Sequence, residues 1–228
     1  CLGSDAVIFD LEDAVSPAEK DAARILVRNT MRYMDFRGCE IIVRINSIDT
    51  PYWRQDLDAM LPQQPALILL PKTGSAADVL AADAYMSEVE AKLGFEKNTV
   101  GLMPLIETAM GVENAYAIAS ATERVKALFL GAEDLTADLQ CKRTKEGREI
   151  EYARTRLVVA ARAAGVEVYD TPFTDVNDDE GIWTDAQLAK ALGFTGKASI
   201  SPRHVEVINQ VFSPTQKEVD YAYEVMDA

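Results

Sequence analysis

Seven short apolar runs, separated by segments with helical caps, constrain the fold of this chain most strongly. Each run is continuously apolar rather than alternating, and each stops at glycine or at polar residues, which is typical of parallel strands buried on both faces. The predicted strands are residues 6–9, 41–45, 66–70, 100–106, 125–130, 166–169 and 197–200.

The segments between these runs carry signals for the ends of helices. Residues 16–19, 75–78 and 213–216 have the Ser-x-x-Glu/Asp/Gln pattern of a capping box, in which the first side chain and the fourth bond the helix start reciprocally. Glycines at 94, 165 and 193 stand where we expect helices to stop. The chain therefore alternates strand and helix throughout.

This alternation leaves two α/β folds, a doubly wound open sheet or a (β/α)8 barrel. Polar residues at the carboxyl ends of six different strands favour a barrel, because an open sheet concentrates its ligand groups at one switch point. No Gly-x-Gly-x-x-Gly follows a strand. These polar residues are Asp10, Glu12, Asp13, Arg44, Asn46, Lys72, Glu107, Asp134, Asp170 and Thr171.

We therefore predict that residues 1–228 form a single TIM-barrel domain. A chain of 228 residues without a low-complexity stretch is long enough to bury one large core. Because only seven strands are visible, we expect the first strand and helix of the barrel to precede Cys1.

The composition excludes several classes of partner. With 23 Lys and Arg against 37 Asp and Glu, the net charge of −14 disfavours nucleic acid and anionic lipid. The longest apolar runs fall far short of the roughly 20 residues that span a bilayer. The three cysteines lack metal-ligand spacing and fit free thiols in a reducing compartment, and no signal peptide is visible, so we expect a cytoplasmic protein.

Two carboxylates are the leading candidates for chemistry. Glu107 and Asp134 each stand where an apolar run breaks, so in a barrel they face one mouth from adjacent strands. Converging carboxylates repel unless they share a cation or a proton, and with one histidine in the chain the pattern favours Mg²⁺ with oxygen ligands. The alternative for each residue is a helix N-cap or a surface charge.

Arg44 lies within an apolar strand, where a charge requires a partner. One interpretation is a structural ion pair with Asp10 or Glu12. The other is that its planar fork binds a substrate carboxylate or stabilises a developing enolate oxygen, and the two are compatible.

Weaker candidates surround this pair. Gly131 and Ala132 could form an anion-binding turn or a simple tight turn. Lys72 could contact phosphate or be a loop lysine, and the basic run at residues 142–145 is better explained as a solvated loop than as a phosphate site. We interpret His204 as a helix-terminal or surface residue.

Six ordered motifs resemble the citrate lyase beta subunit-like family, which is grouped with the HpcH/HpaI aldolases and malyl-CoA lyases. They occupy residues 5–13, 43–46, 70–72, 104–108, 131–135 and 170–173, and the resemblance covers essentially the whole chain. It implies a barrel of the phosphoenolpyruvate/pyruvate type, a homotrimer or hexamer, and magnesium-dependent chemistry on a carbon–carbon bond of an acyl-CoA.

Carried over by position, the resemblance makes Glu107 and Asp134 the metal ligands. It makes Arg44 and Glu107 catalytic and substrate-binding, and gives the Gly131-Ala132 backbone a contact with the keto-acid carboxylate. The family's opening strand and its C-terminal lid, which supplies a catalytic aspartate to a neighbouring subunit, are not found in the sequence. Residues 200–202 read Ile-Ser-Pro where relatives commonly have Ile-His-Pro.

The expected function is a magnesium-dependent lyase that cleaves or forms a 3-hydroxy-acyl-CoA thioester such as malyl-CoA or citramalyl-CoA, or performs the citryl-CoA step of citrate lyase. One alternative is a magnesium-dependent aldolase acting on free keto acids without coenzyme A. Another is a non-catalytic subunit that binds a keto acid or an acyl-CoA.

Overall fold

A computed structural model describes residues 2–226 and contains one seven-stranded parallel sheet in which the strand order follows the chain. Six strands lie within two residues of their predicted bounds, which confirms the interpretation of the apolar runs. The strands are β1 (Ala6–Asp10), β2 (Glu40–Arg44), β3 (Leu67–Leu70), β4 (Gly101–Ile106), β5 (Ala127–Leu130), β6 (Glu167–Asp170) and β7 (Gly196–Lys197).

The last strand is shorter than predicted. β7 ends at Lys197 rather than at residue 200 because the chain turns immediately after it. Ala198 still donates its N–H to the Asp170 carbonyl at 3.0 Å, but the Ser199 hydroxyl then bonds the Ser201 carbonyl at 2.6 Å. This local turn replaces the sheet pairing, and α9 begins at Pro202.

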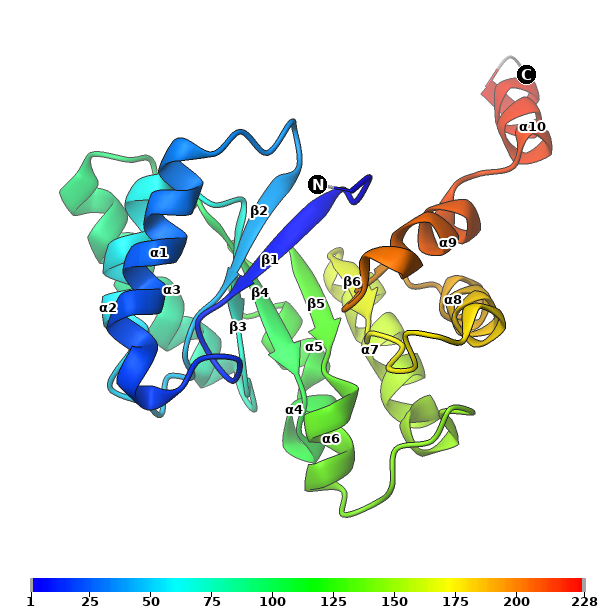
Figure 1. The fold of residues 1–228 in the computed structure, drawn as a ribbon, viewed down its shortest axis with the longest axis horizontal. Helices are drawn as coiled ribbons and strands as arrows, with labels where there is room; N and C mark the ends of the chain where they lie inside the picture. Colours follow the sequence, from blue (N-terminus) through cyan, green and yellow to red (C-terminus); the bar gives the residue numbers. More distant parts are fainter. Residues whose placement is uncertain (1, 227–228) are drawn as a thin grey trace.

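The sheet curls into a half-barrel with helices on its outer side (Figure 1). Among residues 2–226, β1 pairs only with β2 and β7 only with β6, so the two edge strands do not pair with each other. A groove of about 780 Å³ lies on the inner side of the sheet, lined by residues of all seven strands and by α9 from Pro202 to Phe212. The fold is therefore of the α/β barrel type, as predicted, with an open side.

The connecting segments are mostly helical. No helix within the described residues combines the length and apolar character needed to cross a membrane. The helices are α1 (Lys20–Tyr33), α2 (Trp53–Met60), α3 (Ala76–Leu93), α4 (Ala109–Glu113), α5 (Ala115–Ala119), α6 (Ala132–Asp138), α7 (Glu151–Ala164), α8 (Asp179–Leu192), α9 (Pro202–Phe212) and α10 (Gln216–Met226), with 3-10 turns at Pro17–Glu19, Leu61–Gln63 and Arg148–Ile150.

The three predicted capping boxes have different outcomes. At the start of α3 the box is confirmed, because the Asp78 carboxylate accepts the Ser75 N–H at 2.8 Å. At residues 16–19 the prediction is wrong, since Ser16 makes no side-chain cap and precedes a 3-10 turn. At α10 the box lies two residues later than predicted, with Glu218 accepting the Thr215 N–H at 2.7 Å. The three predicted stop glycines all end helices in the left-handed conformation.

Both faces of the central strands are buried, which explains why these strands are continuously apolar, whereas the edge strand β1 has no buried residue. Alternate strand residues such as Val43 and Leu128 join the large core under the helices. Their neighbours, Ile42 and Phe129, join a smaller cluster on the inner face. A run that alternated polar and apolar residues would place polar groups in one of these two cores.

The cysteines differ from the prediction at one position. Cys141 is free and exposed, as expected. Cys39 is disulfide-bonded, so the prediction of a free thiol is wrong there. Cys1 lies outside the described residues.

Candidate active site

The predicted site residues gather at the carboxyl ends of neighbouring strands. Glu107 directly follows β4, and Asp134 lies in the first turn of α6, which follows β5. Arg44 is the last residue of β2 and stands opposite Asp10, the last residue of β1, in the strand register. Parallel strands end at one edge, so the fold delivers these groups to the same mouth.

Glu107 is a buried carboxylate in a partly negative environment. It is only 3% exposed, and its Oε1 accepts the backbone N–H of Lys72 at 2.6 Å. Burial, reinforced by the negative charges of Asp134 and Glu12, raises the pKa of Glu107 to about 8 despite the Lys72 N–H and the charge of Arg44. An ionised carboxylate here is therefore costly without a cation.

Asp134 supplies the second carboxylate. It is half-buried, and within residues 2–226 it has no hydrogen-bond or ion-pair partner, although its charge acts on Glu107. Gly131, and not Asp134, occupies the N-cap position of α6, and Thr108 caps α4 after Glu107. Neither carboxylate is thus an N-cap, which was one part of the alternative explanation, and the burial of Glu107 also excludes a surface charge there.

This arrangement fits a hard divalent cation. Two carboxylates in mutual repulsion, one of them desolvated, are a donor set that Mg²⁺ accepts. No group of three or more His, Cys, Asp or Glu side chains in the described part of the chain could hold a metal ion. A cation here would therefore depend on Glu107 and Asp134, with other oxygen ligands from outside the protein.

Gly131 makes room for the Glu107 carboxylate. A Cβ at position 131 would lie 2.8 Å from both Cβ and Oε2 of Glu107, closer than side-chain carbons pack. Its N–H donates to the Ile106 carbonyl at 3.0 Å. The close approach of α6 to the end of β4 thus requires glycine at position 131.

Arg44 is engaged by two acids. Its Nε donates to Asp10 Oδ1 at 2.8 Å, and its Nη1 lies 3.3 Å from Glu12 Oε2. The hydrogen bond and charge of Asp10 outweigh burial and raise the pKa of Arg44. The structural ion pair proposed for Arg44 is therefore present, and its role toward substrate stays a prediction.

Lys72 is exposed in the loop after β3, as one of its two interpretations expected, but its ammonium group is paired with acids. Its Nζ lies 2.8 Å from Oε1 of the buried Glu12 and 3.5 Å from Asp13. The hydrogen bond to Glu12 raises the pKa of Lys72. Sequence reasoning missed this pair, although both residues were recognised as following strands.

The Ala132 backbone N–H already has an acceptor. It donates to Thr171 Oγ1 at 3.2 Å, and Thr171 is 1% exposed. A substrate carboxylate that used this N–H, as the family resemblance implies, would have to replace the threonine hydroxyl. The contact of Gly131 and Ala132 with substrate therefore stays a prediction.

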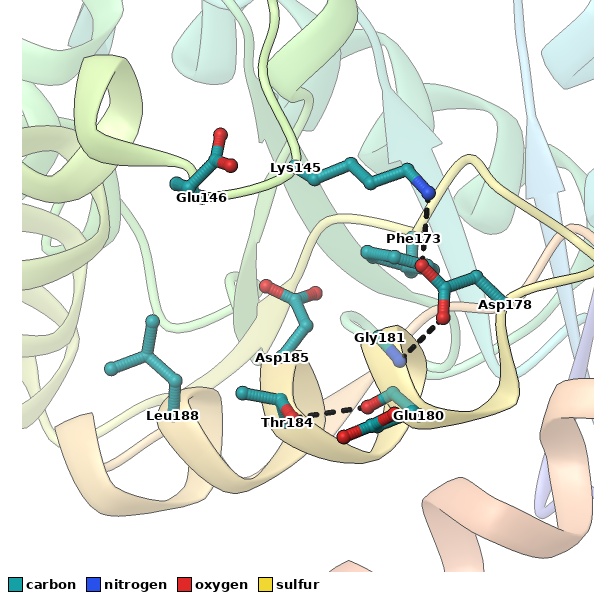
Figure 2. Close-up of a pocket in the computed structure, with 9 residues that line it drawn as sticks. All are labelled: Lys145, Glu146, Phe173, Asp178, Glu180, Gly181, Thr184, Asp185 and Leu188. Atoms are coloured by element: carbon teal, nitrogen blue, oxygen red, sulfur yellow. Dashed lines mark hydrogen bonds and ion pairs between the residues drawn. The ribbon is translucent and has the colours of Figure 1, made fainter.

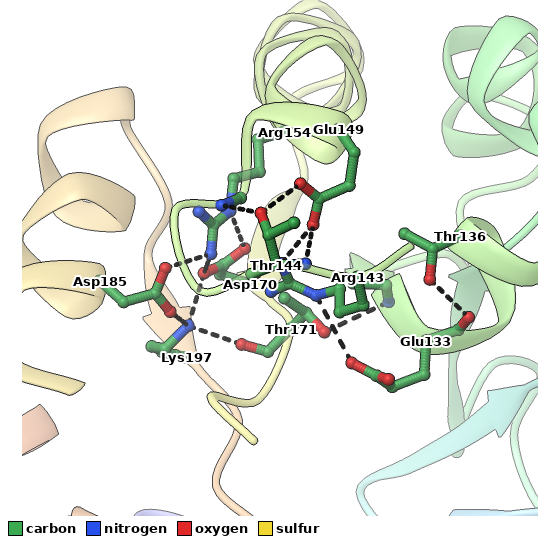
Figure 3. A network of polar contacts seen from close by, with 12 residues as sticks. Glu133, Thr136, Arg143, Thr144, Glu149, Arg154, Asp170, Thr171, Asp185 and Lys197 are labelled. Atoms are coloured by element: carbon green, nitrogen blue, oxygen red, sulfur yellow. Dashed lines mark hydrogen bonds and ion pairs between the residues drawn. The ribbon is translucent and has the colours of Figure 1, made fainter. Parts of the chain in front are cut away.

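A buried tetrad of charges holds Thr171 in place (Figure 3). Asp170 pairs with Arg154 at 2.8 Å and with Lys197 at 2.7 Å, and Asp185 pairs with the same two cations. Lys197 also donates to the Thr171 carbonyl at 2.6 Å. Two positive and two negative charges balance, which is how a fold tolerates buried ions.

The basic run at residues 142–145 is neutralised by acidic neighbours. Arg143 lies 2.7 Å from Glu149, and Lys145 lies 2.6 Å from Asp175 and 2.9 Å from Asp178. These pairs support the interpretation as a loop and leave little positive charge for a phosphate.

A cavity of about 360 Å³ adjoins this loop (Figure 2). Its lining includes Glu146, Asp178, Glu180 and Asp185 against a single lysine. Neither this cavity nor the groove on the inner side of the sheet is lined by Arg44, Glu107 or Asp134. The candidate site is thus defined by its contacts at the mouth and not by a cavity.

His204 is helix-terminal, as one of its two interpretations expected, and the surface interpretation is wrong. The residue is fully buried in the first turn of α9, and its ring centroid lies 6.2 Å from that of Phe173. The periodicity of α9, which buries Ile208 and Val211 on the same side, could have indicated this placement.

A model of one protein family matches most of the chain. The family is described as HpcH/HpaI aldolase/citrate lyase, and the match covers residues 1–202. The chain belongs to this family. Among its curated relatives, citrate lyase subunit beta of Leuconostoc mesenteroides subsp. cremoris is 43% identical over 227 residues, covering 100% of this chain and 75% of the relative.

Other members of the HpcH/HpaI family extend the comparison. L-malyl-CoA/beta-methylmalyl-CoA lyase of Cereibacter sphaeroides is 35% identical over 99% of this chain and 77% of the relative. The protein CitE of Mycobacterium tuberculosis, solved with magnesium, acetoacetate and coenzyme A, is 31% identical with a TM-score of 0.79, covering 99% of this chain and 79% of that structure. These similarities confirm the family predicted from the motifs.

Glu149 makes the free energy of unfolding of this HpcH/HpaI family member depend on pH in the acidic range. Burial opposes ionisation, but hydrogen bonds from Thr144 and Arg143 prevail and lower the pKa of Glu149 from 4.5 to about 2. A lowered folded pKa stabilises the fold above about pH 4.5, and this stabilisation is lost as the pH falls towards about 2.

We expect Glu149→Gln to reduce the free energy of unfolding by about 1–2 kcal/mol at neutral pH, measured by urea unfolding. The difference from the wild type should shrink between about pH 4.5 and about 2. Glu146→Gln, at an exposed position in the same loop, is the control and should show neither effect. A difference for Glu149→Gln that is independent of pH would contradict the assignment.

Gly131→Ala tests the close approach of α6 to Glu107. The added Cβ should displace the carboxylate, weaken binding of Mg²⁺ by at least about tenfold and cost about 1–3 kcal/mol of stability. Titration calorimetry and thermal unfolding measure the two effects. Gly74→Ala is the matched control, because a Cβ there meets no atom closer than 3.8 Å. Equal Mg²⁺ affinity in both variants would show that Glu107 is not part of the metal site.

Proposed function

We propose that this chain is a magnesium-dependent carbon–carbon lyase acting on a 3-hydroxy-acyl-CoA thioester such as malyl-CoA, citramalyl-CoA or citryl-CoA. The observation that carries the proposal is the pair of carboxylates, Glu107 and Asp134, at the mouth of a barrel-type sheet. The similarity to citrate lyase beta and malyl-CoA lyases supports the reaction class.

In this proposal Glu107 and Asp134 hold the cation, which supplies Lewis-acid polarisation of substrate oxygens when bound. The complex of CitE with magnesium and acetoacetate supports a small keto acid as the second ligand. Lys72 and Gly131 orient the Glu107 carboxylate, through a hydrogen bond to one oxygen and close packing beside the other.

Cleavage removes a proton from the 3-hydroxyl group and breaks the bond between the hydroxyl-bearing carbon and the carbon next to the thioester. The electron pair of that bond passes to the thioester fragment as an enolate, and the other fragment leaves as a keto acid. Arg44, held at the mouth by Asp10, is the cation we assign to the enolate oxygen. Protonation of the enolate carbon completes the reaction.

We further propose a cytoplasmic homo-oligomer, a trimer or a hexamer, in which residues 1–228 belong to one barrel domain. Exposed apolar side chains on α10 support association, since Tyr221, Tyr223 and Met226 are at least 64% exposed. The net charge of −14 supports small-molecule partners rather than nucleic acid.

A screen of acyl-CoA thioesters and free keto acids with added Mg²⁺ tests the function. The lyase proposal predicts saturable, Mg²⁺-dependent release of a keto acid from one of the thioesters. Turnover of free keto acids without coenzyme A would identify an aldolase instead. Binding of oxaloacetate or acetyl-CoA without any turnover would identify a non-catalytic subunit.

Asp134→Ala tests the metal site itself. We expect loss of measurable Mg²⁺ binding, with a change in stability within about 0.5 kcal/mol, because a half-buried carboxylate without a protein partner belongs to the site and not to the core. Calorimetry with Mg²⁺ and thermal unfolding provide the measurements. Glu133→Ala removes the adjacent carboxylate, which is 59% exposed, and should retain wild-type affinity. Unchanged affinity in Asp134→Ala would exclude this residue from the site.

A further inference from the structure

The geometry points to Lys72 as a positioning residue for Glu107, a role that rests on the proposed metal site. Lys72 contacts both Glu107 and Glu12, which lie in the loops after β4 and β1. Its backbone bonds the first acid and its side chain bonds the second. One residue thus connects the proposed metal carboxylate to the acids that surround Arg44.

The backbone of Lys72 is in the left-handed region, with φ at +52°. Residues with a Cβ rarely adopt this conformation, because the Cβ crowds the following carbonyl oxygen. This φ sets the direction of the Lys72 side chain relative to its own N–H, so the N–H donates to Oε1 of Glu107 at 2.6 Å while Nζ lies 2.8 Å from Oε1 of Glu12. In the right-handed or extended conformation, the side chain and the following residues would point elsewhere relative to that N–H, and the contacts with Glu107 and Glu12 would not form together.

The residues after Lys72 are fixed by contacts that make this conformation possible. Thr73 Oγ1 donates to the Leu70 carbonyl at 2.9 Å, and Asn114 Nδ2 donates to the Gly74 carbonyl at 2.8 Å. Gly111 packs so closely that a Cβ there would lie 2.6 Å from the Thr73 carbonyl oxygen. The loop is therefore held on its far side by α4 and α5.

The side chain of Lys72 anchors the near side. Its Nζ lies 2.8 Å from Glu12 Oε1, and Glu12 is only 4% exposed. The Glu12 loop is itself fixed, because Lys20 Nζ donates to the Leu11 and Glu12 carbonyls at 2.8 and 2.7 Å. An ion pair with a buried, immobile acid can hold Lys72 in an unfavourable backbone conformation.

Two substitutions separate the roles of the backbone and the ammonium group. Lys72→Ala and Lys72→Gly both remove the ammonium and keep the N–H, but only alanine has a Cβ in the left-handed conformation. We expect Mg²⁺ affinity to fall by about tenfold in Lys72→Ala, since the left-handed strain is of that order. Lys72→Gly and Lys72→Arg should stay within about threefold of the wild type, because the first lacks the strain and the second retains the cation.

Gln64 is the matched control position. It also has φ at +52°, but it precedes β3 and so lies at the opposite end of the strand from Lys72. Gln64→Ala and Gln64→Gly should change the unfolding temperature without changing Mg²⁺ affinity. Circular dichroism confirms that each variant is folded before calorimetry with Mg²⁺.

Each outcome decides the assignment. Wild-type affinity in Lys72→Ala would overturn it, because the residue would then not position Glu107. Equal weakening in Lys72→Ala and Lys72→Gly would also overturn it and assign the effect to the ammonium group alone. If the wild-type protein binds no Mg²⁺, the metal site falls together with the role of Lys72, so this failure is distinct from the other two.

Discussion

The repulsion between Glu107 and Asp134 is the constraint on which the site depends. A fold gains nothing from burying a carboxylate beside another negative charge unless something positive or a proton joins them. Here burial first, and then the negative charges of Asp134 and Glu12, raise the pKa of Glu107 to about 8. The surrounding contacts, from the Lys72 N–H to the missing side chain of Gly131, keep the carboxylate in this unfavourable position. Such strain concentrated at one point is typical of a functional site.

The other charges at the strand ends are arranged in two groups of ion pairs. Arg44 and Lys72 face Asp10, Glu12 and Asp13, while Arg154 and Lys197 face Asp170 and Asp185. The first group surrounds Arg44, the cation that we assign to the substrate. The second holds Thr171 against the start of α6. Beside these ion pairs, Asp134 is a carboxylate without its own protein partner among the described residues. It therefore stays available to a ligand.

The sequence was sufficient for the strands and for the convergence of Glu107 and Asp134, since burial on both faces produces continuous apolar runs and parallel strands share one end. The sequence was insufficient where the local backbone conformation decides which groups contact each other. The turn at Ser199 ends β7 early, and the hydrogen bond from the Lys72 N–H to Glu107 accompanies a left-handed backbone that the residue type does not indicate. The burial of His204 was missed because the residue was considered alone, without the apolar residues Ile208 and Val211 on the same side of α9.

Helix α10 projects from the rest of the molecule (Figure 1), and none of its described residues is buried. An isolated helix of about ten residues is only marginally stable in water. Gln216–Met226 therefore gains little free energy from packing on this chain's own core. Its backbone amides should exchange rapidly when the helix stands alone, and slowly when another surface covers it.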